Sequence, residues 1–554
     1  MKGTIIILMM LMLVLTACTT DDQNNSITNE FDMMDENSMN DGMMGGQLDS
    51  GLLAGQGLDV SQLPQAKSST IVDVADGETY AISADIIKKN INGKELTMYG
   101  YNGMIPGPAL RVSQGSTITV DFKNNIDMNT TVHWHGLRHD IENDGVPGVS
   151  QPPVAPGQSF SYELYFPDDG IFWYHPHIRE DIQQDSGLAG NMLVTPTEKY
   201  NPVNREELLV LDDLLLDVNG NMVPFGTKHA NYAVMGRFGN TMLTNGETNY
   251  ELTVQKGEIV RFYITNVANV RPYNLSIDGA RMKLVGGDLG QFEYEEFVES
   301  IIIAPAMRYF IDVDFAESGT YNLMNINPHE EYVLGSITVT DDSVSVSHVE
   351  NFENDLTNQN IIDDIASFEQ YFDKPVDYEL TLDIDMGGMM EMMASLPCHV
   401  MGGIVMGDCT EEQRMDLEAE HEEMTIEWED EMNMKASGSM IKWIIEDTAT
   451  GKQNMDIGMT ANVGDIVKIK LFNDPESMHP MQHPVHLHGQ RFIVTELDGK
   501  PVENKVWTDT VLIPIGSTAE ILVDVTNPGE WMMHCHIAEH LEAGMMTGFM
   551  VNEV

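Results

Sequence analysis

Short stretches of the chain alternate apolar and polar residues, with glycine at one end and asparagine at the other. The three clearest copies span residues 115–124, 257–266 and 464–473. Side chains on a β-strand point to opposite faces in turn, so this alternation is typical of a strand with one buried face. Three copies in a chain of 554 residues predict three structural units of similar build.

A second pattern follows each of these strands. It starts with glycine and runs over residues 170–177, 319–326 and 529–536. The first and third copies end in histidines, whereas the middle copy has Met324 and Ile326 in their place. We therefore expect the middle unit to share the fold of its neighbours, to bind no catalytic metal and to serve as a spacer.

Turn residues and the lack of a long helical period indicate the fold class. Short alternating strands, separated by turns that contain Gly and Pro, predict an all-β protein made of β-sandwiches. The second and third copies of the strand pattern lie farther apart in the chain than the first and second. This spacing places an insertion in the third unit.

The most specific chemical motif lies near the C-terminus, where His534, Cys535 and His536 are followed by His540 and Met545. On a strand, His534 and His536 point to one face and Cys535 points to the other. A thiolate with imidazoles and a weak thioether is the ligand set of a blue electron-transfer copper. We therefore expect two metal sites that share one strand.

Three further motifs repeat the histidine spacing of two residues. A single histidine is more often a structural core or surface residue than a ligand. Four clusters at matching spacing, together with a cysteine and a methionine, argue against that interpretation. The additional histidines are His133 and His135 in HWHG, His175 and His177 in HPH, and His483, His486 and His488 in HPVHLHG.

These motifs and HCHIAEHLEAGM resemble the four copper motifs of the multicopper oxidases, and the resemblance spans residues 70–554. It implies three cupredoxin-like Greek-key β-sandwich domains, at residues 68–200, 201–345 and 346–554, with a trinuclear copper site between the first and third. The implied ligands are His483, Cys535, His540 and Met545 for a type 1 copper, His133 and His486 for a type 2 copper, and His135, His175, His177, His488, His534 and His536 for a type 3 pair.

The same resemblance implies the route of electrons and protons. Electrons would pass from the type 1 copper through Cys535 to His534 and His536. Asp144 occupies the place of the family's acidic residue near the type 2 copper and is the candidate proton relay. Copper-efflux members have Glu directly after the second type 1 histidine, where this chain has Leu541 followed by Glu542.

Residues 386–440 form a methionine-rich insertion with twelve methionines among Gly, Asp and Glu. Methionine usually fills apolar cores, but these polar neighbours build no ordinary core. Thioethers are soft ligands that favour Cu(I). We expect a charged helix within residues 406–434, and the placement resembles the Met-rich segment of bacterial copper-efflux oxidases. Candidate ligands for substrate Cu(I) are Met478, His479, Met481, Met386, Met389, Met390, Met392 and Met393, although surface coincidence would also explain Met478, His479 and Met481.

The N-terminus has the pattern of an exported protein. Lys2 precedes an apolar run at residues 5–15 that is too short for a comfortable membrane span. The following Leu-Thr-Ala-Cys18 resembles a bacterial lipoprotein signal, with an ordinary cleaved signal peptide as the alternative. We expect a signal peptide at 1–17, a lipid on Cys18 and a flexible Met-, Asp- and Asn-rich tether at 18–67. The protein would then lie on the outer face of the cytoplasmic membrane or in the periplasm.

The remaining cysteines and the net charge indicate which bonds and binding partners to expect. Export would permit a disulfide between Cys398 and Cys409, and a soft-metal site is the alternative. The formal net charge is -58, and the resulting electrostatic field repels nucleic acid and attracts cations. Adaptation of an exported surface explains this charge equally well. We expect a monomer that binds no nucleic acid.

The function that these observations favour is a multicopper oxidase that couples oxidation of Cu(I) to four-electron reduction of O₂ to water, for copper tolerance. It would carry four copper ions, with possible extra Cu(I) in the insertion. Alternatives are a laccase-type phenol oxidase and an Fe(II) or Mn(II) oxidase. A copper-binding electron-transfer lipoprotein without catalysis is disfavoured, because it would have no use for eight trinuclear ligands.

Overall fold

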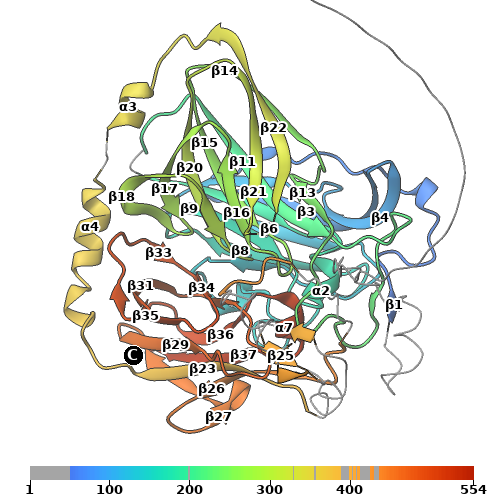
Figure 1. The fold of residues 1–554 in the computed structure, drawn as a ribbon, viewed down its shortest axis with the longest axis vertical. Helices are drawn as coiled ribbons and strands as arrows, with labels where there is room; N and C mark the ends of the chain where they lie inside the picture. The colour runs from blue at the N-terminus through green and yellow to red at the C-terminus, as the bar shows by residue number, and fades with distance from the viewer. Residues whose placement is uncertain are drawn as a thin grey trace, which may run out of the picture. The chain divides into compact units, whose positions relative to one another are not determined.

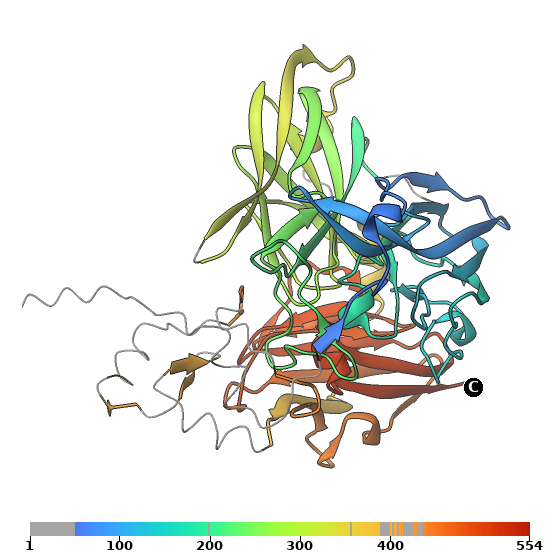
Figure 2. The same ribbon diagram turned by 90° about the vertical axis from the view of Figure 1, so that its right-hand side faces the viewer.

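The computed structural model describes residues 50–197, 200–328, 330–354, 357–387, 399–401, 404–406, 409–411, 413, 425–429 and 436–553. Six sheets within these residues form three sheet pairs, and each pair is built from one continuous part of the chain (Figures 1 and 2). The prediction of an all-β fold is confirmed. The exact domain boundaries stay a prediction, because residues 48–554 form one compact unit.

The first sheet pair lies within residues 71–195. One sheet has the strand order β4-β3-β6-β8 and the other β2-β5-β10-β9-β7. Alternation explains β6, in which Ile118, Val120 and Phe122 are buried while Asp121 and Lys123 are exposed. The bounds are β2 Ile71–Asp73, β3 Thr79–Ile91, β4 Lys94–Tyr101, β5 Ala109–Ser113, β6 Thr117–Asn124, β7 His133–His135, η2 Ile141–Asn143, β8 Ser159–Tyr165, β9 Gly170–His175, α2 Glu180–Gln183 and β10 Gly190–Thr195.

The second sheet pair lies within residues 205–343. Its sheets have the orders β13-β11-β15-β20-β17-β18 and β14-β22-β21-β16-β19. The bounds are β11 Arg205–Leu214, β12 Phe225–Gly226, β13 Thr241–Thr244, β14 Tyr250–Lys256, β15 Glu258–Asn266, β16 Tyr273–Ile277, β17 Arg281–Gly287, β18 Gly290–Val298, β19 Ile301–Ile303, β20 Arg308–Phe315, β21 Gly319–Ile326 and β22 Glu331–Ser343.

The third sheet pair lies within residues 378–552. Its sheets have the orders β27-β26-β23-β29-β35-β31-β32, with β33 also on β31, and β28-β37-β36-β30-β34. The bounds are β23 Tyr378–Asp385, β26 Lys442–Asp447, β27 Lys452–Gln453, η4 Asn454–Asp456, β28 Met459–Asn462, β29 Ile466–Asn473, β30 His483–Leu487, β31 Arg491–Leu497, β32 Lys500–Pro501, β33 Trp507–Thr508, β34 Thr510–Ile513, β35 Thr518–Asp524, β36 Gly529–Cys535, α7 Ala538–Glu542 and β37 Met546–Asn552.

Both repeated sequence patterns occupy matching places in the three pairs. The first pattern gives β6, β15 and β29, and the second gives β9, β21 and β36. Each strand of the second set pairs antiparallel with a neighbour, as β7·β9, β16·β21 and β30·β36. In the first and third pairs these neighbours carry the histidine motifs, whereas β16 and β21 carry none. The prediction of three units of similar build is therefore confirmed.

Apolar side chains join the three sheet pairs into one unit. Between the first and second pairs, a buried cluster contains Trp173, Ala189 and Val210 together with Val267 and Ala306. The second pair also contributes residues from two loops to the core of the third. These residues are Ala233, Val234, Met235, Phe238 and Val270. Apolar side chains are therefore buried where the pairs meet.

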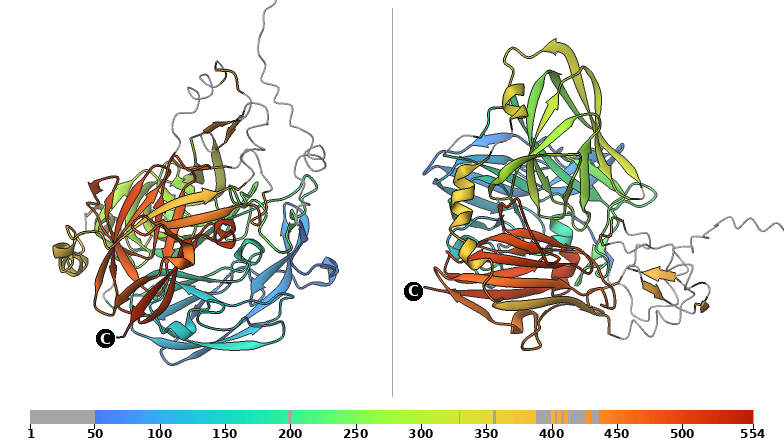
Figure 3. Two further views of the ribbon diagram at one scale, coloured as in Figure 1. Left: turned by 90° about the horizontal axis from the view of Figure 1, so that it is seen from below. Right: turned by 60° about the vertical axis from the view of Figure 1, so that its left-hand side comes forward.

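A helical linker connects the second and third sheet pairs. It contains α3 Val349–Glu353, α4 Gln359–Ala366 and η3 Glu369–Tyr371. In Figures 1 and 3, α3 and α4 run along the outside of the sheets from one pair to the next. Asp364 of α4 accepts a hydrogen bond from Trp507 Nε1 at 2.7 Å, which fixes the linker to the third pair.

The N-terminal segment differs in part from the expected tether. Residues 1–49, including Cys18, lie outside the described residues. From residue 50 the prediction of a flexible tether is wrong, because β1 Ser50–Leu52 pairs with β12, and η1 Val60–Gln62 follows. Ala54 is buried, and Ala66 N–H donates to Lys88 O at 2.7 Å. The hydrogen bonds among these contacts are made by backbone groups, so an alternation of apolar and polar residues could not predict them.

The methionine-rich insertion connects β23 and β26, which are antiparallel neighbours in the larger sheet of the third pair. Its described part includes a small hairpin of β24 His399–Met401 and β25 Ile404–Met406. The helix expected within residues 406–434 falls mostly outside the described residues. Cys409 is disulfide-bonded, and its expected partner Cys398 is not among the described residues. In the described parts of the chain, no helix has the length and apolar character needed to cross a bilayer.

Packing between β14 and β22 predicts a position that tolerates only glycine. Gly335 of β22 lies opposite Tyr250 of β14, and an added Cβ would sit 2.4 Å from Tyr250 O. We expect Gly335→Ala to lower the free energy of unfolding by about 1–3 kcal/mol, measured by urea denaturation, because the strands must separate. Gly548→Ala is the control, since its nearest contact would be 3.7 Å. Equal unfolding midpoints for the two variants would contradict the packing.

Candidate metal centres

Four strands bring eight histidines into one buried cluster. In the first sheet pair, β7 and β9 place His133 opposite His175. In the third pair, β30 and β36 place His486 opposite His534. Even the most exposed member, His177, is only 8% exposed. The eight histidines are His133, His135, His175, His177, His486, His488, His534 and His536.

Their ring nitrogens converge in three groups, and within each group the donor atoms lie within 4.8 Å of one another. Each group combines residues of the first and third sheet pairs. The groups are His135 with His175 and His536, His177 with His488 and His534, and His133 with His135 and His486. The first two match the ligand sets expected for a type 3 pair, and the third contains both histidines expected at a type 2 copper.

Backbone carbonyls fix the proton on four of these rings. The Nδ1–H groups of His133 and His175 donate to Asp144 O at 2.8 Å and Pro176 O at 2.9 Å. Those of His486 and His534 donate to Asp509 O and Cys535 O, both at 2.9 Å. A carbonyl can only accept, so each ring carries its lone pair on Nε2.

The lone pairs point at one another in the buried interior. The Nε2 atoms of His133, His175 and His486 are buried without a hydrogen-bond partner. His488 donates from Nδ1 to Asp144 Oδ2 at 2.9 Å, so its Nε2 lone pair faces that of His534 at 3.0 Å. Two converging lone pairs repel unless they share a cation. Bound metal would resolve the repulsion, and histidine ligands commonly donate their other N–H in this way.

Electrostatics keep these rings in the metal-binding form. Burial lowers the pKa of His177 to about 3, and burial likewise lowers the pKa values of His488 and His534 well below the usual range. The rings are therefore neutral at physiological pH. Burial acts to raise the pKa of Asp144, but the neighbouring rings of His488 and His133 outweigh it and hold that pKa well below the usual value. Asp144 is thus a carboxylate that accepts from the histidine N–H groups.

A second, smaller centre lies on the other face of β36. Cys535 Sγ is 3.5 Å from His483 Nδ1 and 3.7 Å from His540 Nδ1. Met545 is buried in the same core, and its N–H donates to His540 O at 3.0 Å. Burial raises the pKa of the Cys535 thiol, so a bound cation would be needed to favour the thiolate. Two imidazoles, one thiol and a thioether are the donor set of blue copper.

A loop of the second sheet pair covers this centre. His540 is fully buried, and its Nε2 lies 3.3 Å from Val234 O. Trp443 stacks on the His540 ring with centroids 4.0 Å apart, and its Nε1–H donates to Ala233 O at 2.7 Å. No edge of the imidazole faces solvent. The middle unit is therefore more than the spacer expected from the sequence.

The predicted Cu(I) ligands lie in different environments. His479 and Met481 are fully buried, which removes surface coincidence as their explanation. His479 Nε2 lies 2.7 Å from the sulfur of Met235, a residue of the covering loop that sequence reasoning missed. Met386 is buried in the same core, and Met478 is 40% exposed. Met389, Met390, Met392 and Met393 lie outside the described residues.

Sequence reasoning also missed an acidic residue beside the histidine cluster. Glu180 begins α2, which packs against α7 (Figure 1). Its side chain is buried, and Oε1 lies 3.4 Å from His177 Nδ1. Burial, reinforced by the charge of Glu542, raises the pKa of Glu180 well above its usual value. Leu541 replaces the acidic residue that copper-efflux members have after the second type 1 histidine. Glu180, from the first sheet pair, places a carboxyl group beside the type 3 candidate His177 instead.

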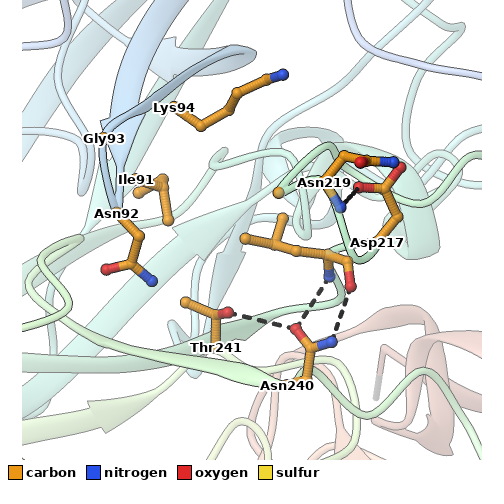
Figure 4. A pocket seen from close by; sticks show the side chains of 10 residues that line it. Ile91, Asn92, Gly93, Lys94, Asp217, Asn219, Asn240 and Thr241 are labelled. Atoms are coloured by element: carbon orange, nitrogen blue, oxygen red, sulfur yellow. Dashed lines mark hydrogen bonds between the residues drawn. The ribbon is translucent and has the colours of Figure 1, made fainter.

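A surface cavity lies apart from these centres. It has a volume of about 630 Å³ and lies between the first and second sheet pairs. Its lining includes Asn92, Lys94, Asp217, Asn240 and Thr241 (Figure 4). The side chain of Asn240 is already bonded to the backbone of Leu216. No histidine or cysteine lines the cavity, so it offers no donor set comparable to the buried centres.

Three family models described as multicopper oxidase match residues 85–199, 213–340 and 425–554, which together make up more than half of the chain. The multicopper oxidase mco of Staphylococcus epidermidis is 27% identical over 459 residues, 81% of this chain and 82% of the relative. Laccase-1 of Botryotinia fuckeliana is 24% identical, covering 82% of this chain and 78% of the relative.

Solved structures share the fold. A multicopper oxidase of Pseudomonas thermotolerans has a TM-score of 0.63 at 24% identity, covering 87% of this chain and 100% of its own. One from Campylobacter jejuni, described as a metallo-oxidase, has a TM-score of 0.63 at 23% identity, covering 91% and 99%.

Fold, donor sets and family models agree on one assignment. Converging imidazole lone pairs and the cysteine-centred group fit the copper cofactors that this family carries. Three family models in chain order correspond to the three sheet pairs. The chain therefore belongs to the multicopper oxidases and is an oxidoreductase.

Proposed function

We propose that this enzyme oxidises Cu(I) at the cell exterior, with O₂ as the electron acceptor, and thereby supports copper tolerance. The observation that carries the proposal is the buried pair of His479 and Met235 beside a covered cysteine centre. When bound, the coppers would take single electrons from the donor and supply four to O₂, which is reduced to water.

The residues would hold four coppers as the motifs predict. The histidine and cysteine donors of these sets converge, Met545 is buried in the same core as Cys535, and hydrogen bonds fix several of the ring protons. The proposed ligands are His483, Cys535, His540 and Met545 for type 1, His133 and His486 for type 2, His135, His175 and His536 for one type 3 copper, and His177, His488 and His534 for the other.

The covered cysteine centre supports a small donor over a bulky one. Val234 O and the Trp443 ring enclose His540, so a phenol could reach the imidazole edge only if the loop moved. A single metal ion needs only ligands along its path. Thioether sulfur and neutral imidazole are soft donors that suit Cu(I).

His479 and Met235 provide such ligands. Burial lowers the pKa of His479 to about 4, so its ring is neutral and has a lone pair available at physiological pH. Met481, also fully buried, follows two residues later and precedes His483. Donors at these positions would bring Cu(I) close to the type 1 ligand His483.

Within the chain, β36 links the two centres. The backbone O of Cys535 accepts the Nδ1–H of His534, so the thiol residue and a trinuclear ligand are joined by one short hydrogen bond as well as by the peptide bond. Asp144 would orient His488 and His133 and move protons towards the type 2 side. Its carboxylate meets the Nδ1 of His488 at 2.9 Å and that of His133 at 3.3 Å.

Laccase-type phenol oxidation is the second candidate. It is favoured by relatives such as Laccase-1 of Botryotinia fuckeliana, whereas the structural neighbour from Campylobacter jejuni is described as a metallo-oxidase. We further propose export as a monomer with a lipid on Cys18. The N-terminal motif supports this location, and mass spectrometry of the membrane-bound protein would test it.

Removing the sulfur of Met235 distinguishes the two candidate functions. Met235→Leu conserves side-chain volume, so the fold should be kept. We expect the KM for Cu(I) to rise about tenfold, because a substrate ligand is lost, while phenol oxidation stays within about twofold. Oxygen uptake with each donor measures both. Met282→Leu, in the buried core of the second sheet pair, is the control. An unchanged KM for Cu(I), or an equal loss with phenol, contradicts the cuprous assignment.

Replacing Asp144 by Asn tests the carboxylate near the type 2 ligands. Asn keeps the shape but cannot act as an anionic proton carrier, so we expect turnover to fall about tenfold or more. The blue absorption of the type 1 copper should be retained. Asp168→Asn is the matched control, because Asp168 is a buried carboxylate of the same sheet pair that binds Arg138. Turnover slowed less than twofold would remove Asp144 from the mechanism.

A further inference from the structure

One arginine of the second sheet pair reaches the histidine cluster. Arg308 begins β20 and its side chain is fully buried. Its Nη1 and Nη2 groups donate to Asp509 Oδ1 at 2.7 Å and Oδ2 at 2.5 Å. Its Nε–H donates to Ile171 O of β9 at 3.0 Å. One guanidinium therefore joins all three sheet pairs at the back of the cluster.

Asp509 connects this guanidinium to two histidines. It lies between β33 and β34, and its Oδ1 is 2.9 Å from His135 Nε2. Its backbone O accepts the Nδ1–H of His486 at 2.9 Å. Thr510 Oγ1 also donates to Oδ1, at 2.8 Å. A carboxylate clamped in this way only accepts, so His135 must carry its proton on Nε2.

This contact makes His135 different from its neighbours. His133, His175 and His486 present Nε2 to the interior, but His135 presents Nδ1, which is buried and has no hydrogen-bond partner. His135 belongs to two of the candidate metal groups, and with Nε2 bonded to Asp509 its Nδ1 is the ring nitrogen left to bind a metal. If the ring took the other tautomer, a proton would occupy the nitrogen that faces the other ligands.

The backbone beside His135 leaves space for the ion pair. Gly136 has φ +87°, and an added Cβ would lie 2.4 Å from Asp509 Oδ2 and 2.9 Å from Arg308 Nη2. The glycine of the HWHG motif thus lets the carboxylate and guanidinium pack directly against the strand end. On the other side, Asp288 accepts from Arg308 N–H at 2.8 Å and from the Thr508 hydroxyl.

We propose that Arg308 is a positioning residue for the trinuclear copper site. By holding both oxygens of Asp509, it fixes the tautomer and direction of His135 and anchors the carbonyl that orients His486. The second sheet pair, which supplies no ligand, is then required for full copper occupancy. This inference rests on the ligand roles in the proposed function.

Arg308→Lys tests the guanidinium. Lysine keeps the charge but cannot hold both oxygens in one plane. We expect trinuclear copper affinity to fall about 10–100-fold, as for other residues that orient ligands. Metal analysis should show copper lost from the trinuclear site, with weaker type 2 resonance and type 3 absorption, while the blue type 1 absorption is retained.

Arg261→Lys is the matched control. Arg261 lies in β15, next to β20, and forms a buried two-hydrogen-bond pair with Asp312, both at 2.7 Å. Both variants disturb the same sheet, so urea unfolding should show a comparable loss of stability. We expect Arg261→Lys to keep its full copper. Equal copper loss in the two variants would make the role of Arg308 merely structural and overturn the proposal.

A second variant covers the case in which Arg308→Lys does not fold. Asp509→Asn keeps the shape of the side chain but weakens the clamp, and the same selective loss of trinuclear copper is expected. Full trinuclear occupancy in either folded variant overturns the proposal. Failure of the proposed function is distinct, because the unmodified protein would then bind fewer than about four coppers, or bind four and not oxidise Cu(I).

Discussion

Eight imidazole lone pairs have to converge inside a buried interface, and this constraint governs the surrounding structure. Neutral rings are required, which burial ensures by lowering the pKa values of most of them, as at His177 and His534. Each ring must also place its proton away from the centre. Backbone carbonyls such as Pro176 O and Cys535 O accept these protons, and Asp144 and Asp509 serve rings that no carbonyl reaches. The metal-binding form is therefore set by the fold before metal arrives.

Strand geometry ties the two centres together. On β36, alternation sends Cys535 to one face and His534 to the other, so the distance between the centres is fixed by a single residue step. Pairing with β30 repeats the arrangement, since His483 contacts Cys535 while His486 lies opposite His534. A slip of one residue in this register would exchange the faces and destroy both donor sets at once. The paired strands therefore need a rigid core, which Trp531 and Phe549 help to form.

The sequence alone predicted the features that depend on residues close together in the chain. Spacing of two residues placed the histidine pairs on common faces, and the repeated strand patterns matched β6, β15 and β29. The resemblance supplied the grouping of the ligands. What sequence could not give depends on contacts between distant segments. Met235 meets His479, Glu180 meets His177 and Arg308 meets Asp509 only because the sheet pairs pack together. None of the three residues belongs to a spaced motif that would have singled it out.

These long-range contacts change the interpretation of the middle sheet pair as a spacer. Its strands β16 and β21 carry no histidine, yet residues of this sheet pair contact both centres. Its loop places Val234 and Met235 over the cysteine centre, and the start of β20 places Arg308 behind the trinuclear cluster. A unit that only separated its neighbours would need an apolar interface and nothing more. A buried guanidinium costs desolvation energy unless its partners are fixed, so its presence here argues for a role in ordering the histidines that apolar packing could not perform.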